Sequence, residues 1–547
     1  MSIREAYQEL RHRELKEKAL AFYAEHNVTG VIEKLLNEMY VAAPTDVYGY
    51  MSEYFRGLSK EPTISKLVPS QVLDDRGYSA LEVHVLCTVA GVEKHVCSAT
   101  VSLQRETEPF FVVAAAPKSG TTPKKHGDKE KQLENEQQVV IAKEECVDPL
   151  ESVARLISSA LNGLTVKNQG LVDSTISELN AGGGCSLHPS AVLGASCAVA
   201  RAGAILGNVP LHQHIAALCS VSRQSFALPI PVVGAIGSGL VGCGKLRFLE
   251  FCLVPSPEVS TLEQVTNLTA IYRQIGEVLA SKGGPIGQAV ISNVGYCPSL
   301  DKAEQALDLL QECIQKAGLE LNNHVTILID AGAHRFFDKE KLKYEVIVGQ
   351  WKSSDELTKL YCDILDSYPG VLGFVNPLHQ SDVQGWQELS QRLGARCLLV
   401  ADRTLVELPT KMTPPETKGG EDVNDTPGAK ADSGGDKVEP SALSYLSCAT
   451  AVLDLTITAA LNELNRLKGC SHCIMLKAPP IPTSDPIIAD LAVATQCRFL
   501  RLGSPTGVTS CSTVSRLLAI KEELVLQHKH EPTKPHIFTC QPLVVET

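Results

Sequence analysis

The chain has 547 residues, of which 44% are hydrophobic, and a mean hydropathy of +0.02, so it can hold a large core and two or three domains. Its formal net charge is −12, from 50 basic and 62 acidic residues, which argues against nucleic acid or an anionic membrane as the main partner. The N-terminus is charged and no uninterrupted apolar run reaches membrane-spanning length, so we expect a cytoplasmic protein without a membrane span.

Eighteen cysteines are scattered along the chain. Because no signal peptide precedes them, they do not indicate the disulfide framework of a small secreted domain, and we expect mostly buried free thiols. Cys470 and Cys473 form one CxxC pair, but no second CxxC accompanies it and Cys473 begins an apolar run. The pair is therefore weak evidence for a zinc or redox site.

Residues 1–62 are predicted to be helical. A long charged helix comes first, and a second helix carries apolar residues at helical spacing, namely Val31, Ile32, Leu35, Leu36 and Met39. Pro44 breaks this pattern, and a short amphipathic helix, VYGYMSEYF, follows with Thr45 or Asp46 as its N-cap.

This order of Leu-Leu-x-x-Met, proline and aromatic residues resembles the dimerisation and docking helices of the regulatory-subunit RIIα and Dpy-30 family, which associate as a four-helix bundle. The resemblance implies that residues 1–62 dimerise and dock protein partners. The alternative is an ordinary helical extension that packs on the next domain.

From 63 to 219 the pattern is α+β, with a strand-like SALEVHVLCTV followed by helical runs such as SAVLGASCAVARAGAILG. Two polar segments, at about 117–140 and 410–440, are too hydrophilic to bury and are predicted to be insertions. Residues 220–528 otherwise alternate strands and helices, as an α/β barrel does, and 529–547 form a C-terminal tail.

The glycine-rich segment LPIPVVGAIGSGLVGCGKLRFLEF, at 228–251, has the composition of a nucleotide-binding loop. However, GSGLVG contains no lysine, and the order of strand, loop and helix fits neither a dinucleotide fingerprint nor a P-loop. A nucleotide site is not predicted here.

Three apolar runs each end in an ionisable residue: VTILID at Asp330, CLLVAD at Asp402 and CIMLK at Lys477. Such runs indicate buried parallel strands, and catalytic groups of α/β barrels collect at the C-terminal strand ends. Two carboxylates that hold Mg²⁺ and a lysine base would suit metal-assisted proton abstraction. Ordinary ion pairs at strand ends are the alternative.

Several segments resemble enolase in one consistent order. The LPxP with its glycine-rich loop opens the barrel domain of that family, before a strand that carries a catalytic Glu ahead of Phe, where this chain has Glu250. DDRGYSALEVHVL, NVPLHQHIA and LLAIKEEL are similar to family segments, and DAGAHRFF, YPGVLGFVNPL and VADRTLVELP fall where the family has its metal-ligand strands. The chain is therefore identified as a divergent member of the enolase family.

The resemblance implies an α/β fold, with an α+β N-terminal domain and an eight-stranded barrel, and a homodimer. It implies phosphopyruvate hydratase activity, which converts 2-phosphoglycerate to phosphoenolpyruvate with Mg²⁺ as cofactor. Lys477 matches the catalytic base and Glu250 a catalytic and substrate-binding carboxylate. Asp330 and Asp402 match two of three metal ligands, and Arg501 stands at the position of the family's second active-site lysine, in the substrate site.

The departures from the family are equally specific. The third metal ligand corresponds to Val375, and Asn376 replaces the aspartate that follows it, so Mg²⁺ binding is expected to be weak. The loop that bears the family's general acid is reduced to Asn-Val-Gly before Tyr296. The position of the loop histidine is Val241, and we expect the phosphate-gripping Ser-His-Arg-Ser-Gly segment to be deleted between Lys477 and Asp485. Ser119 is a candidate for the mobile serine loop.

Two hypotheses about function follow. The chain is either a glycolytic lyase with a reduced active site or a scaffold that keeps the fold and docks partners. The expected location is the cytoplasm, and a flagellum is the alternative. The matched residues also admit purely structural roles: Asp330 and Asp402 as strand-end hydrogen-bonding groups, Lys477 as their counter-ion, and Glu250 as a partner of Arg501 or Lys245.

Overall fold

The computed structural model describes residues 3–74, 77–103, 147–181, 186–219, 226–239, 244–283, 289–291, 294–402, 448–453, 455–469, 473–478 and 483–527. The expected insertions and the C-terminal tail lie outside these residues. The chain divides into two compact units, of which the first comprises Met1–Thr63 and Thr88–Lys94 and the second comprises Ile64–Cys87 and His95–Thr547.

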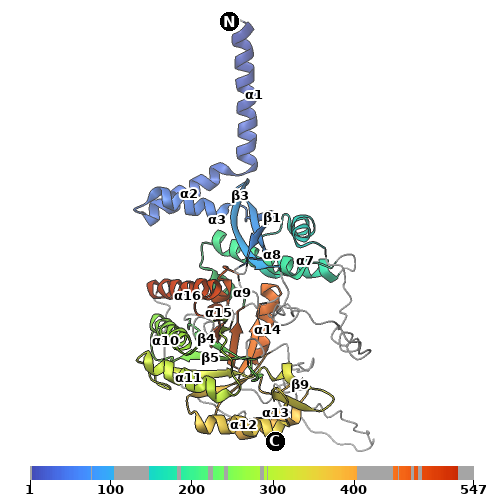
Figure 1. Ribbon diagram of the computed structural model, residues 1–547. Helices are drawn as coiled ribbons and strands as arrows, with labels where there is room; N and C mark the ends of the chain where they lie inside the picture. The colour runs from blue at the N-terminus through green and yellow to red at the C-terminus, as the bar shows by residue number, and fades with distance from the viewer. Residues whose placement is uncertain are drawn as a thin grey trace, which may run out of the picture. The chain divides into compact units, whose positions relative to one another are not determined.

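The first unit contains three helices, α1 (Ile3–Glu25), α2 (Val28–Ala42) and α3 (Val47–Leu58), as the sequence predicted (Figure 1). Asp46 is the N-cap of α3, because its side chain accepts a hydrogen bond from the Gly49 N–H at 2.8 Å. This bond satisfies one of the backbone donors that a helix start leaves without an intrahelical partner.

The second unit begins with a three-stranded sheet, in the order β1 (Thr63–Leu73), β2 (Ser79–Val89) and β3 (Val92–Ser102). A helical region follows, with the elements α5 (Pro149–Glu151), a π-helical turn (Ser152–Ile157), α6 (Ser158–Leu161), α7 (Gln169–Ala181), α8 (Pro189–Leu206) and α9 (Leu211–Leu218). Among the described helices, α8 alone is long and apolar enough to cross a membrane, and 67% of it is buried inside the protein, as in the core helix of a folded domain.

Eight strands then close into a barrel, since the last strand pairs with the first. In spatial order they are β4 (Ile230–Gly237), β5 (Glu250–Pro255), β8 (Val325–Asp330), β12 (Val371–Val375), β13 (Leu398–Asp402), β14 (Cys448–Val452), β15 (Cys473–Lys477) and β16 (Phe499–Arg501). β5 runs antiparallel to both of its neighbours, whereas the other pairs are parallel. This arrangement confirms the predicted barrel.

Apolar side chains from these strands fill the barrel interior, among them Val232, Cys252, Leu328, Val375, Val400, Cys448, Met475 and Phe499. Short strands extend the sheet or lie outside it: β6 (Val290–Ile291) and β7 (Gly295–Tyr296) continue from β4, and β9 (Phe337–Asp338), β10 (Lys343–Ile347) and β11 (Gln350–Lys352) form a separate small sheet.

Helices alternate with the barrel strands along the chain (Figure 1). They are α10 (Thr261–Gly283), α11 (Ala303–Lys316), α12 (Ser354–Ser367), α13 (Val383–Leu393), α14 (Ile457–Gly469), α15 (Ile487–Ala494) and α16 (Val508–Leu526), with a 3₁₀ turn at Ala333–Phe336. In α10 the buried residues Leu268, Ile271, Tyr272 and Ile275 recur at three- and four-residue spacing, which gives one apolar stripe that packs on the barrel.

Candidate active site

The barrel gathers the matched residues of the enolase resemblance at one end. Asp330, Asp402, Lys477 and Arg501 each end a parallel strand. Glu250 instead begins β5, but because β5 is antiparallel its first residue lies beside the last residue of β8, and Glu250 and Asp330 are register partners. Catalytic groups of α/β barrels are found at this end.

Arg501 bridges the two carboxylates. Its Nη2 atom contacts Oε1 of Glu250 and lies 2.6 Å from Oδ2 of Asp330. The side chains of these three residues are at most 5% exposed. The structural alternative for Glu250, an ion pair with Arg501, is therefore observed, whereas the contact of Arg501 with Asp330 was not predicted.

The electrostatics favour a permanently charged arginine. Burial lowers the pKa of Arg501, but the nearby charges of Glu250 and Asp330 outweigh it, so the pKa is raised well above the ordinary value. A buried charge of this kind persists only where opposite charges and hydrogen bonds compensate for lost hydration. The bridge is thus a fixed feature of the interior.

Glu250 and Asp330 have further close neighbours. The Cys252 thiol donates to Oε1 of Glu250 at 3.2 Å, and the Gly332 N–H donates to Oδ1 of Asp330 at 3.0 Å. Oε2 of Glu250 is buried and accepts no hydrogen bond from the described residues. A Cβ atom at Gly234 would lie 3.1 Å from this oxygen, so glycine keeps open the space beside it.

The position predicted to match the third metal ligand is apolar. Val375 ends β12, between Asp330 and Val400 in register, and its side chain is 0% exposed in the barrel core. Asn376 follows it with a positive φ of 48°, and its N–H donates to the Val400 carbonyl at 2.7 Å. Valine offers no oxygen to a cation.

Lys477 ends β15 as the register partner of both Val452 and Arg501, and its side chain is partly exposed. No ion pair joins Lys477 to a described residue, and Arg501, not Lys477, is the counter-ion of Asp330. Asp402 ends β13 opposite Thr450 in the register, but its side chain lies outside the described residues.

An aromatic pair lies near the shortened loop at which the family's general acid is expected. Tyr296, on β7, is a register partner of Ile236, and its ring centroid is 4.7 Å from that of Tyr272. Burial raises the pKa of both tyrosines, so these hydroxyls remain protonated near neutral pH. Val241 and Ser119 lie outside the described residues.

The described residues do not fit Mg²⁺. Each Asp330 oxygen already accepts a hydrogen bond or ion pair, Val375 supplies no ligand, and no group of three His, Cys, Asp or Glu side chains suited to a metal occurs in the part of the chain that the structure describes. Mg²⁺ prefers near-octahedral coordination by oxygen. Arg501 is the cation that these residues hold.

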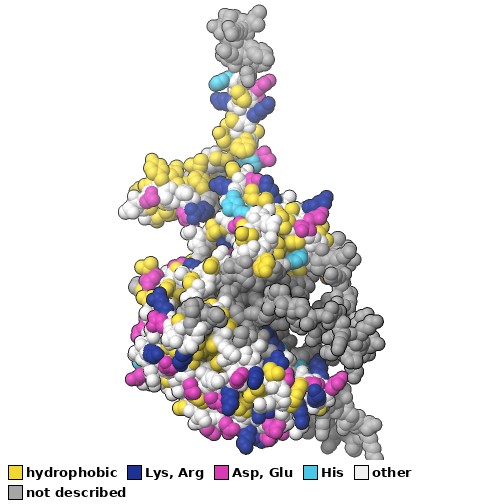
Figure 2. Space-filling view, viewed as in Figure 1, with side chains coloured by type: hydrophobic (Ala, Val, Ile, Leu, Met, Phe, Trp, Pro, Cys, Tyr) yellow, Lys and Arg dark blue, Asp and Glu magenta, His cyan; other side chains and the backbone are white. Residues whose placement is uncertain are grey.

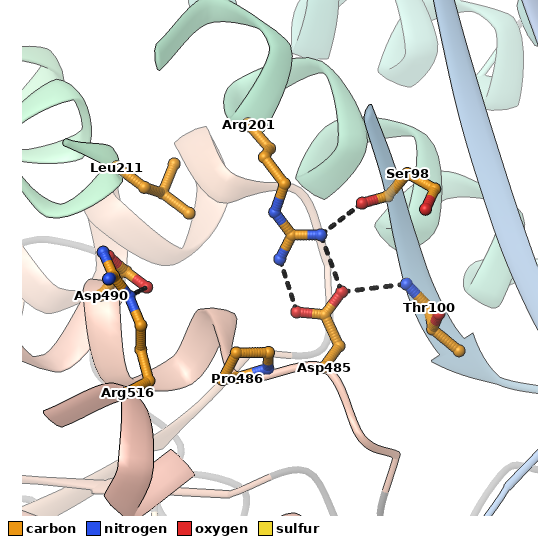
Figure 3. A pocket seen from close by; sticks show the side chains of 8 residues that line it. All are labelled: Ser98, Thr100, Arg201, Leu211, Asp485, Pro486, Asp490 and Arg516. Carbon is orange, nitrogen blue, oxygen red and sulfur yellow. Dashed lines mark hydrogen bonds and ion pairs between the residues drawn. The ribbon is translucent and has the colours of Figure 1, made fainter. Parts of the chain in front are cut away.

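A second polar region is a pocket of about 290 Å³ where β3, α8, α9, α15 and α16 meet (Figure 3). Asp485 accepts hydrogen bonds from Arg201, at 2.6 and 3.1 Å, and from the Thr100 N–H at 3.0 Å. Arg516 makes a similar two-bond contact with Asp490, at 2.7 and 2.9 Å. Each arginine is paired with a carboxylate. These ion pairs link the N-terminal sheet and helices to the barrel and do not offer free charge to a ligand.

Comparison with known proteins agrees with the barrel. Residues 225–419 match the family described as Enolase, C-terminal TIM barrel domain. The chain is 29% identical to Enolase 4 of Xenopus laevis over 93% of this chain and 92% of that protein, and 26% identical to Enolase 4 of Homo sapiens over 94% and 88%. It is also 29% identical to Enolase of Methanopyrus kandleri over 69% of this chain and 81% of that protein. With a closed barrel of this topology and Glu250, Asp330, Lys477 and Arg501 at one end, the chain belongs to the enolase family.

Proposed function

We propose that this chain is an enolase-family protein in which dehydration of 2-phosphoglycerate to phosphoenolpyruvate is severely impaired. The observation that carries the proposal is the bridge of Arg501 to Glu250 and Asp330. Arg501 pairs with Glu250, which the resemblance matches to a catalytic carboxylate, and with Asp330, which it matches to a metal ligand. Neither carboxylate is then available for the family reaction.

The charge at this end of the barrel supports the proposal. Proton abstraction beside a carboxylate creates a dianionic enolate, which enolase-superfamily sites stabilise with one or two Mg²⁺ ions. Glu250 and Asp330 are each negative, and Arg501 and Lys477 are each positive. These four groups therefore offer no net positive charge to an anionic substrate, and the positive charge of Arg501 is already neutralised.

An assay of phosphoenolpyruvate formation by the full chain with Mg²⁺ tests this proposal. We expect a rate far below that of an active enolase measured in parallel. A turnover comparable with that of the active enzyme would show that the Arg501 bridge opens during catalysis, and it would overturn the proposal.

Calorimetry should show weak Mg²⁺ binding by the unmodified chain, because one carboxylate ligand is replaced by Val375 and another is paired with Arg501. The double variant Val375→Glu, Arg501→Lys should bind Mg²⁺ more tightly, since it adds a carboxylate and removes the guanidinium whose Nη2 atom contacts both Glu250 and Asp330. Val375→Gln with Arg501→Lys is the matched control of equal size without the added charge. Tight binding by the unmodified chain would contradict the prediction.

A scaffold role is the second candidate function, and the surface of α2 and α3 favours it. Large apolar side chains are exposed there, with Tyr40 at 88%, Tyr48 at 84% and Leu36 at 48% exposure. Figure 2 shows hydrophobic side chains gathered over these two helices. Contiguous apolar surface of this kind marks protein interaction sites. The helices would thus dimerise or dock partners while the barrel serves as a stable body.

The isolated segment 1–62 should be helical and dimeric if α2 and α3 form a docking bundle. Apolar faces gain stability by packing against one another, and a short helix pair alone is marginal in water. Circular dichroism and sedimentation measure the two properties. Replacing Ile32 and Leu36 together by Asp should dissociate the dimer, whereas Lys34→Ala, at an exposed charged position, should not. A monomeric, unfolded 1–62 segment would contradict the docking role.

A further inference from the structure

Thiols gather at the end of the barrel opposite Lys477. Cys448 is the first residue of β14, Cys473 is the first residue of β15, and Cys497 lies two residues before the start of β16. Cys448 and Cys473 are register partners on neighbouring parallel strands.

The backbone places these two cysteines within reach of a disulfide. Hydrogen-bonded strands lie about 4.8 Å apart, and disulfides join Cα atoms that are about 4.4–6.8 Å apart. Register partners on parallel strands direct their side chains to the same face of the sheet. Cys448 belongs to the barrel core, and Cys473 packs against that core.

The environments of the two thiols differ in a way that suits a nucleophile and a resolving thiol. Cys473 is partly exposed, whereas Cys448 is 0% exposed. The neighbouring Cys448 thiol and the charge of Arg498 lower the pKa of Cys473 despite burial, which acts in the opposite direction. Burial, followed by the proximity of the Cys473 thiol, raises the pKa of Cys448 well above its ordinary value. The thiolate is the reactive form of cysteine.

We propose that Cys473 and Cys448 are a peroxide-oxidisable dithiol that closes into a disulfide between β14 and β15. The Cys473 thiolate attacks one oxygen of hydrogen peroxide, the O–O bond breaks, and hydroxide leaves and is protonated to water, which gives a sulfenic acid. The Cys448 sulfur then attacks the Cys473 sulfur, the S–O bond breaks, and a second water leaves. The two thiols lose two hydrogens and two electrons, and the peroxide is reduced to two waters.

The disulfide should form and break reversibly. Because the strand register already places the two cysteines at the Cα spacing of a disulfide, β14 and β15 need not separate for the bond to form or to be reduced. Exchange with a thiol reductant therefore restores the dithiol. The pair is therefore a reversible switch in the barrel wall, independent of hydratase activity.

The test oxidises the full chain with hydrogen peroxide, alkylates the remaining thiols and maps the peptides by mass spectrometry. We expect a Cys448–Cys473 cross-linked peptide, with a mass lower by two hydrogens, that dithiothreitol abolishes. A link between Cys470 and Cys473, or oxidation of Cys473 to sulfinic acid with Cys448 still reduced, would overturn the proposal. Mapping on the unmodified chain keeps the test valid even where a variant folds poorly.

Variants separate the two roles. Cys448→Ala should lose the cross-link and leave a sulfenic acid on Cys473 that dimedone traps, whereas Cys473→Ser should lose both products. The controls Cys470→Ser, which removes the other cysteine of the CxxC pair, and Cys511→Ser, which removes an exposed thiol, should leave the Cys448–Cys473 cross-link at its original yield. Loss of the cross-link in either control would contradict the assigned pairing.

Discussion

Phosphoenolpyruvate formation by this chain should be at least ~10²–10⁴-fold slower than that of an active enolase under the same conditions, because the loss of a positioned general acid alone typically costs that factor. The loop ahead of Tyr296, which the resemblance matches to the loop that bears the family's general acid, contains no acidic residue. Loss of an electrostatic stabiliser costs a further ~10²–10³ where it acts alone. Groups that act on one transition state fail together, so these factors do not simply multiply.

Lys477 does not compensate for these losses. A base removes a proton beside a carboxylate only when the resulting enolate is stabilised, and the Arg501 charge is committed to Glu250 and Asp330. Any hydratase turnover that remains should still depend on Lys477, because no other described lysine ends a barrel strand.

The measurement compares the full chain with its Lys477→Ala variant in saturating Mg²⁺ and follows phosphoenolpyruvate directly. An equal background signal from both proteins would support the hypothesis that hydratase activity is impaired. Turnover near that of an active enolase, lost in Lys477→Ala, would restore the glycolytic lyase hypothesis. Lys521→Ala, on α16 and away from the strand ends, is the matched lysine control and should change nothing.

The barrel strands could be predicted from the sequence because their patterns are strong and local. The runs ending at Asp330, Asp402 and Lys477 are buried on both faces, which makes them continuous and apolar, and the structure ends strands at each of these residues. The reversed direction of β5 was not predicted, since a buried strand of Glu250–Pro255 has the same pattern in either direction.

The contacts within the site were harder to predict because they depend on packing between distant residues. Glu250 and Arg501 are far apart in sequence, and only closure of the barrel through β16 and β4 brings them together. The residue type at position 501 did give one indication of these contacts. The resemblance matches this position to a family lysine, and the arginine found here has a longer, planar group with several donors, which suits two carboxylates at once. The register of Cys448 with Cys473 likewise could not be predicted without knowledge of which strands pair.

Arg501→Ala should lower the free energy of unfolding by ~3–5 kcal/mol at neutral pH, which is the usual cost of removing one partner from a buried ion pair. The variant leaves Glu250 and Asp330 as two buried carboxylates in register beside each other without a cation. Urea titration followed by circular dichroism measures the loss. Arg466→Ala, which removes an exposed pair with Glu463, should cost no more than ~1 kcal/mol and is the surface control.

A neutral triple variant separates the contribution of charge from that of packing. Arg501→Met combined with Glu250→Gln and Asp330→Asn removes all three charges at similar volume and should recover most of the lost stability. If Arg501→Ala is instead as stable as the unmodified chain at neutral pH, the guanidinium does not hold these carboxylates together, and the argument that they are unavailable for catalysis fails with it.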